Sequence, residues 1–97
     1  MIIAELAIFP TSEGASVSRF VREAIRIIES SGLKSETGAM STVIETPDLS
    51  SLWRVIEAVD AALVRMGAAR IHVDLRIDHR LDKAATIASK KKAVAKV

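Results

Sequence analysis

The sequence predicts an α+β domain in which two amphipathic helices cover one face of a four-stranded antiparallel sheet. Residues 70–78 alternate strictly between apolar and polar or charged side chains, which is typical of a strand with one buried face. Residues 17–28 and 49–66 instead repeat apolar side chains every three or four positions, as amphipathic helices do. The chain has 97 residues, 49% of them hydrophobic, and is therefore large enough to bury one core as a single domain.

The first predicted elements are a strand over residues 2–9 and the helix that follows it. The strand is apolar on both faces apart from Glu5, as expected for an interior strand, and Pro10 should end it because proline has no backbone N–H. We expect Ser16 to be the N-cap of the helix, since its hydroxyl can accept one of the unpaired N–H groups of the first turn. Gly32 can adopt the left-handed conformation that ends a helix.

Residues 33–46 show no helical repeat and predict a β-hairpin. Its strands are expected at 33–37 and 40–46, with Gly38 and Ala39 forming a two-residue type II′ turn. One continuous bent strand is the alternative. Pro47 should end the second strand.

The second helix is predicted to start at Asp48 or Ser50, either of which can cap it, and to end at Gly67. Trp53 lies beside the apolar stripe, where packing is a more common role for tryptophan than stacking on a ligand. The members of that stripe are Leu49, Leu52, Ile56, Val59, Leu63 and Met66.

The chain is predicted to divide into a folded body of residues 1–82 and a lysine-rich C-terminal helix and tail of residues 83–97. We expect Asp82 to cap a short helix over 84–88. Nine basic and twelve acidic residues give the body a net charge of −3, whereas five lysines and no acid give the tail +5. The basic balance of the whole chain is therefore a property of the tail, which argues against a nucleic-acid-binding groove on the body.

The order strand, helix, strand, strand, helix, strand is the ferredoxin-like βαββαβ arrangement. Right-handed crossovers place the first strand between the third and the fourth. Glu5 then lies on the sheet face away from the helices, opposite Arg70, His72 or Arg76. A sheet face that is partly apolar and partly charged is usually covered by another subunit, so we expect the chain to form a homo-oligomer, whose order the pattern does not give.

Short segments along nearly the whole chain carry a family resemblance. The most specific are Met-Ser-Thr-Val-Ile-Glu at 40–45 and Arg-Ile-Asp-His-Arg-Leu-Asp-Lys at 76–83, together with Thr-Ser-Glu-Gly-Ala-Ser-Val-Ser-Arg-Phe-Val at 11–21. With these segments the chain resembles the small thiamine-binding protein family. The resemblance implies a ferredoxin-like fold, dimers built by joining sheets, frequent tetramers, and binding of thiamine or a thiamine-like pyrimidine without catalysis. Thr46-Pro47 departs from the glycine that many relatives have there.

A thiamine site needs a carboxylate for the permanent positive charge, hydroxyl or carbonyl partners for the aminopyrimidine, and a flat apolar wall. The candidate ligand-binding residues, at a subunit-interface pocket, are Ser16, Ser18, Thr42, Glu45 and Asp78. Thr42 and Glu45 fall on opposite faces of a regular strand, so a bulge or the strand end would have to turn one of them. Each candidate also has an ordinary structural alternative: an ion pair for the carboxylates, strand packing for Thr42 and a cap for Ser16.

The sequence gives little support to catalysis. It has no cysteine, which excludes disulfides and thiolate chemistry and fits a reducing, cytoplasmic location. His72 and His79 fall on opposite faces of one strand and do not form a two-histidine metal site, so no metal and no cofactor beyond the bound ligand are expected. We therefore predict a non-enzymatic carrier or sensor without nucleic-acid or membrane partners. The alternative is an oligomeric protein-interaction or regulatory module that binds no thiamine.

Overall fold

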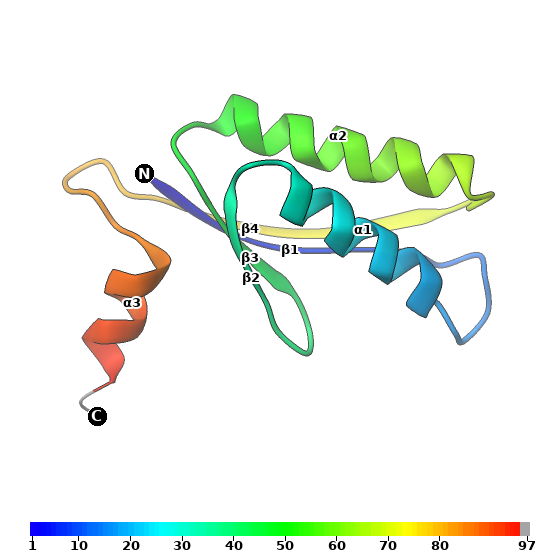
Figure 1. Cartoon of the computed structure of the whole chain (residues 1–97), viewed down its shortest axis with the longest axis horizontal. Helices are drawn as coiled ribbons and strands as arrows, with labels where there is room; N and C mark the ends of the chain where they lie inside the picture. Colours follow the sequence, from blue (N-terminus) through cyan, green and yellow to red (C-terminus); the bar gives the residue numbers. More distant parts are fainter. Residues whose placement is uncertain (96–97) are drawn as a thin grey trace.

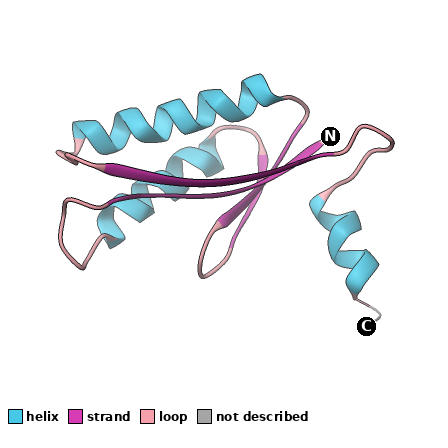
Figure 2. Ribbon diagram, turned by 180° about the vertical axis from the view of Figure 1, so that it is seen from behind, coloured by secondary structure: helices cyan, strands magenta, loops and turns pink. Residues whose placement is uncertain are grey.

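A computed structural model, which describes residues 1–95, confirms the ferredoxin-like α+β fold (Figure 1). The strand order is β2-β3-β1-β4 with antiparallel neighbours, so β1 is central as predicted. Helices α1 and α2 cover one face of the sheet, and α3 lies apart from them beyond the opposite face (Figures 1 and 2). The elements are β1 (Ile2–Pro10), α1 (Ser18–Ser30), β2 (Lys34–Thr37), β3 (Thr42–Thr46), α2 (Leu49–Arg65), β4 (Ile71–His79) and α3 (Ile87–Val94).

The alternation of side chains in β1 separates two faces of the sheet. Ala4, Leu6 and Ile8 point to the helices and are buried in the core. That core also contains Phe20, Ala24 and Ile28 of α1, Ile44 of β3, and Leu52, Val55, Val59 and Leu63 of α2. We call the opposite side the open face, and the register assigns to it Ile3, Glu5, Ala7, Phe9, Lys34, Glu36, Val43, Glu45, His72, Asp74, Arg76 and Asp78.

The start of α1 differs from the prediction. Val17 occupies the N-cap position, no side chain caps the helix, and the prediction that Ser16 is the N-cap is wrong. The preceding loop is instead held by Ser12, whose hydroxyl oxygen accepts the N–H groups of Ala69 and Arg70 at 3.0 and 3.2 Å. This contact holds the loop against the start of β4. Helix α1 begins after the loop, at Ser18.

The β2–β3 hairpin is confirmed, but its turn is longer than predicted. Thr37 and Thr42 form the last pair of the ladder, and a four-residue loop follows, closed by the Gly38 N–H donating to the Ser41 carbonyl at 2.9 Å. A type II′ turn needs a positive φ at its first central residue, and Gly38 is not among the positive-φ glycines. The hydroxyls of Thr37 and Thr42 lie 3.3 Å apart and add a cross-strand contact at this pair.

The short C-terminal helix also begins later than predicted. Asp82 does not cap it, because both carboxylate oxygens accept hydrogen bonds from the Arg80 guanidinium, at 2.5 and 3.0 Å. Thr86 is the N-cap, and it forms a capping box with Ser89. The predicted tail extends over residues 96 and 97, which lie outside the described residues.

At the start of α2 the structure selects Asp48 as the cap, since its carboxylate accepts the Ser51 N–H at 2.7 Å. We expect Asp48→Ala to lower the free energy of unfolding because the first turn of α2 loses its cap, and Ser50→Ala, at an exposed position, to change it little. The Ser51 N–H holds the pKa of Asp48 below its ordinary value. The cap therefore stabilises the fold above that value and is lost as the pH falls through the lowered pKa. Denaturant titrations of both variants across this range would show the difference between parent and Asp48→Ala narrowing at low pH.

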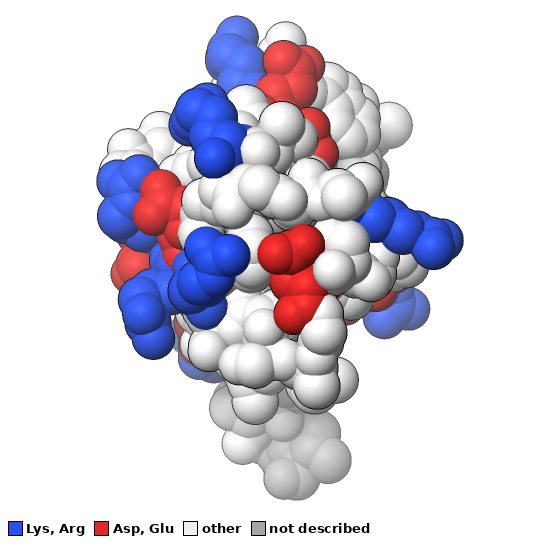
Figure 3. Space-filling view, turned by 90° about the vertical axis from the view of Figure 1, so that its right-hand side faces the viewer, with Lys and Arg blue, Asp and Glu red and all other residues white. Residues whose placement is uncertain are grey.

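The surface charges are mixed where the molecule is viewed from the end away from α3. Basic and acidic side chains are interspersed there around a broad uncharged area (Figure 3). No helix in the described part of the chain combines the length and the apolar character needed to cross a membrane.

Candidate functional site

Two cavities share the hairpin loop Gly38–Ser41 as a common wall. The helix-side cavity, of about 180 Å³, lies between this loop, β1 and α1. The open-face cavity, of about 450 Å³, lies between the same loop, the open face and α3. The loop between β2 and β3 is therefore part of both candidate sites.

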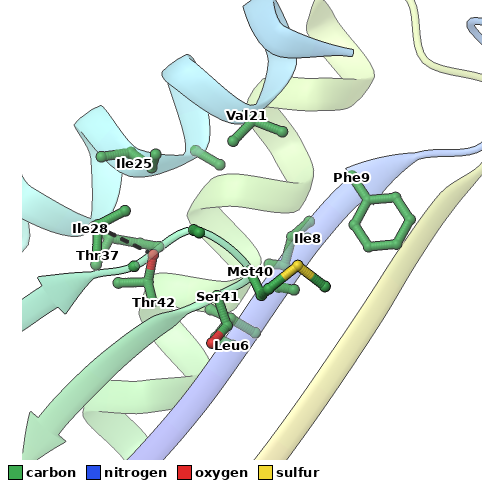
Figure 4. A pocket seen from close by; sticks show the side chains of 14 residues that line it. Leu6, Ile8, Phe9, Val21, Ile25, Ile28, Thr37, Met40, Ser41 and Thr42 are labelled. Atoms are coloured by element: carbon green, nitrogen blue, oxygen red, sulfur yellow. Dashed lines mark hydrogen bonds between the residues drawn. The ribbon is translucent and has the colours of Figure 1, made fainter. Parts of the chain in front are cut away.

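The helix-side cavity is small and apolar. Figure 4 shows side chains of β1 and α1, among them Ile8, Val21 and Ile25, around a space that the Thr37 and Thr42 hydroxyls border at one end. Thr42 is almost fully buried. No charged side chain among residues 1–95 lines this cavity, so these residues offer it no group that could neutralise a cation.

The open-face cavity combines an apolar floor with charged side chains at its rim. Ile3 and Val43 form the floor, and Ile87 of α3 forms part of the wall. Glu36, Lys90 and Lys91 complete the lining. An apolar surface with a few charged groups at its edge is typical of small-molecule sites.

The strand register brings further carboxylates beside this floor. Ile3 lies opposite Glu45 on β3 and opposite Asp78 on β4, so the two acidic side chains flank it on the open face. Glu36 lies opposite Val43 in the same way. These three acidic side chains, from three different strands, therefore lie beside the floor.

Each of these carboxylates is bound to α3. Glu45 accepts the backbone N–H of Ile87 at 2.8 Å. Asp78 accepts a hydrogen bond from the Lys90 ammonium at 2.5 Å, and this contact holds the pKa of Asp78 below its ordinary value. Glu36 accepts one from Lys91 at 2.9 Å. All three acids are thus positioned, and two of them neutralised, by the C-terminal helix.

A second group of charges lies farther along the open face. Of the partners predicted for Glu5, the structure selects Arg76, which lies opposite it in the register with its guanidinium 3.9 Å from the carboxylate. The Ser41 hydroxyl also donates to Glu5 at 3.1 Å. Within residues 1–95 no three histidine or acidic side chains gather as a metal ion would require.

The five predicted ligand-binding residues do not form one site within a single chain. Glu45 and Asp78 lie together beside Ile3, whereas Thr42 is on the helix face and lines the helix-side cavity. Ser16 precedes α1, beyond the opposite end of β1 from Ile3. Ser18 is the first residue of α1, and the two ends of β1 are roughly 26 Å apart at about 3.3 Å per residue.

The sequence analysis missed Glu36, Ile87, Lys90 and Lys91. The alternation of residues 34–37 could have placed Glu36 on the same face as Glu45. The position of α3 against the sheet is a tertiary contact, and the lysine-rich composition of the segment gave no sign of where it docks.

Comparisons with known proteins agree on one family. A family profile described as "Thiamine-binding protein" matches residues 4–95. The UPF0045 protein MJ1052 of Methanocaldococcus jannaschii is 38% identical over 93 residues, which cover 96% of this chain and 91% of that protein. The UPF0045 protein YqgV of Bacillus subtilis is 37% identical over 101 residues, covering 99% and 96% of the two chains. The crystal structure of MJ1052 superimposes with a TM-score of 0.89 at 36% identity, over 99% of this chain and 97% of that one.

Proposed function

This chain belongs to the family of thiamine-binding proteins, and on that premise we propose that it binds thiamine or a thiamine-like aminopyrimidine in the open-face cavity. The observation that carries this proposal is the pair of carboxylates, Glu45 and Asp78, on either side of the apolar floor at Ile3. A flat cationic heterocycle would lay its rings on the floor and place its positive charge and its amino group beside the acids. The protein would act as a carrier or a sensor.

Volume and charge favour this cavity over the helix-side cavity. Pockets for small molecules commonly have volumes of roughly 300–1,000 Å³, a range that includes the open-face cavity at about 450 Å³. The helix-side cavity, at about 180 Å³, is smaller and has no acidic side chain in its lining. Thr42 would then act indirectly, by holding the hairpin loop that borders both cavities.

The chemistry of the open-face cavity supports binding rather than catalysis. A general base works best when its pKa lies near the working pH. The Lys90 ammonium instead lowers the pKa of Asp78, which therefore stays ionised at neutral pH and is a weak base. A fixed negative charge of this kind attracts a cation but does not transfer protons readily.

We further propose that the protein forms a dimer through β4, which continues the sheet across two chains. β4 is nine residues long and lies at the edge of the sheet, so one side of its backbone can pair with another strand. Val73 and Ile77 on its helix face are 41% and 38% exposed, and a partner's α2 and β4 could cover them.

The charges of β4 support one register of this pairing. When two antiparallel copies meet with Leu75 opposite Leu75, Asp74 faces Arg76 and His72 faces Asp78. The neighbouring registers that keep the faces aligned centre on Asp74 or on Arg76 and place like charges directly opposite each other. Of these three registers, only the first places Asp74 opposite Arg76 and, within β4, brings no like charges directly opposite each other.

A dimer of this kind has one continuous open face. Ala7, Phe9 and Val43 add apolar area to this face among the charged residues. Stacking two dimers by these faces would make the tetramer and turn the open-face cavity into a subunit-interface site.

The rival function, an oligomeric protein-interaction or regulatory module without thiamine, rests on the same self-complementary strand. It requires no ligand in the open-face cavity. Calorimetric titration with thiamine, and with its pyrimidine and thiazole halves as controls, separates the two functions. Saturable binding of thiamine supports the carrier or sensor. The absence of any heat of binding at millimolar thiamine supports the interaction module instead.

Glu45→Gln tests most directly whether thiamine binds beside Glu45 in the open-face cavity. Glutamine keeps an oxygen that can accept the Ile87 N–H but removes the negative charge. We expect thiamine to bind the variant at least about tenfold more weakly, since a hydrogen bond to a charged group contributes about 1.5–3 kcal/mol. The free energy of unfolding should change little. Glu57→Gln, at an exposed position of α2, is the matched control, and equal affinity in parent and Glu45→Gln would remove Glu45 from the site.

A further inference from the structure

We propose that α3 competes with a cationic ligand for the carboxylates beside the open-face cavity, so that the contacts of the docked C-terminal helix with these acids weaken ligand binding. The proposal rests on the proposed function of that cavity. It concerns regulation: the fraction of chains with α3 undocked would set the apparent affinity for the ligand.

The contacts of α3 support this competition because they engage three of the four acids beside the apolar floor, all except Glu5, which lies opposite Val43. Lys90 and Lys91 bind Asp78 and Glu36, and the backbone N–H of Ile87 donates to Glu45 at 2.8 Å. The side chain of Ile87 is only 7% exposed and lines the same cavity as Ile3.

These contacts resemble those that a thiamine-like ligand would make. The lysine ammonium groups supply positive charge, the Ile87 N–H supplies a donor to a carboxylate, and the Ile87 side chain supplies apolar area over the floor. A cationic aminopyrimidine offers a positive charge, an amino donor and a flat apolar surface. The ligand and α3 would therefore use the same partners at the same place.

The docking of α3 is also weak enough to be displaced. The side chains of the Lys90–Asp78 pair are 44% and 51% exposed, and those of the Lys91–Glu36 pair are 66% and 52% exposed. Ion pairs that water reaches in this way add little stability. α3 has eight residues, too few for an isolated helix to be stable in water, and it stands apart from α1 and α2 (Figures 1 and 2). Residues 80–86 join it to β4 without a helix or a strand, so undocking of α3 exposes the buried side chains of Ala85 and Ile87 but breaks no strand pairing.

The test compares two double variants of the full chain that lose the same charge. Lys90→Gln/Lys91→Gln removes both ion pairs, whereas Lys83→Gln/Lys92→Gln removes two lysines for which no ion pair occurs in residues 1–95. Glutamine and lysine have similar helix propensities, so the helix itself is conserved. Titration with thiamine should give an apparent affinity about 3- to 30-fold higher for the first variant than for the second, since each exposed pair contributes up to about 1 kcal/mol. A second measurement follows amide hydrogen exchange of residues 87–94 in the parent, which should become faster when thiamine saturates the protein.

Each outcome decides the question. Tighter binding to Lys90→Gln/Lys91→Gln together with faster exchange of α3 supports the competition, even when the parent binds too weakly to measure. Binding that is equal in all three proteins, with unchanged exchange, leaves the thiamine site in place and overturns the competition. Weaker binding to Lys90→Gln/Lys91→Gln overturns it too, because the lysines would then help to hold the ligand. Absence of binding in every protein rejects the proposed function and this inference with it.

Discussion

Arg76→Asp should dissociate the proposed dimer, raising its dissociation constant by about 100-fold or more. In the register centred on Leu75, Arg76 faces Asp74 of the second copy, and the two-fold symmetry repeats this pair. The substitution creates two pairs of like charges at the strand junction, and such contacts cost several kcal/mol in an interface. Sedimentation velocity over a dilution series would measure the change.

Rescue by a charge swap makes this prediction specific to the register. Asp74→Arg/Arg76→Asp restores opposite charges across the same pairs, so we expect it to recover the dimer. Arg22→Asp, at an exposed position of α1, is the control for an equal change in net charge. Because Arg76 also lies near Glu5, a denaturant titration should accompany the measurement. A single variant that stays dimeric, or a double variant that stays monomeric, would contradict the proposed register.

Phe20→Ala should cause the largest loss of stability, about 3–5 kcal/mol. The ring is 1% exposed and packs in the core between the sheet and the two covering helices. Truncation to alanine removes the apolar contacts of the ring and leaves a cavity that the surrounding side chains fill only in part. The Arg19 guanidinium lies 4.1 Å from the ring centroid, so the cation–π contact is lost as well.

Phe9→Ala provides the comparison for this prediction. Phe9 lies on the open face, where it is half-buried and stacks on His72 with the ring centroids 5.1 Å apart. We expect its removal to cost clearly less than that of Phe20. Denaturant titrations at one fixed protein concentration would compare the two, since association changes apparent stability. An equal or smaller cost for Phe20→Ala would show that the core is not centred on this residue.

The fold was predictable because hydrophobic periodicity differs between strands and helices. Strict alternation in 70–78 identified β4, and the three- and four-residue repeats identified α1 and α2. The alternation of side chains in residues 2–9 correctly placed Glu5 on the face away from the helices. The caps and the turn were harder to predict, although Ser16, Asp82 and Gly38 suit such positions. A tertiary contact of Ser12 holds the loop before α1. At α3 and at the hairpin, competing local hydrogen bonds decide the cap and the turn.

The candidate site was predictable only in part. Glu45 and Asp78 share the open face because both lie opposite Ile3, which follows from the strand order and the register. Thr42 lies three residues before Glu45 on a regular strand, so the two point to opposite faces. The register of β3 is regular, so no bulge turns either side chain to the other face. The docking of α3 depends on contacts between residues 12 to 55 positions apart in sequence, for which a local pattern gives no signal.

The most direct test of the central claim is the location of bound thiamine, measured by amide chemical shifts of isotope-labelled protein during a titration. Binding in the open-face cavity predicts saturable shifts at Ile3, Val43 and Glu45 and at the hairpin loop Gly38–Ser41. Shifts centred on Val21 and Ile25 would place the ligand in the helix-side cavity. An unchanged spectrum at millimolar thiamine would contradict the account altogether.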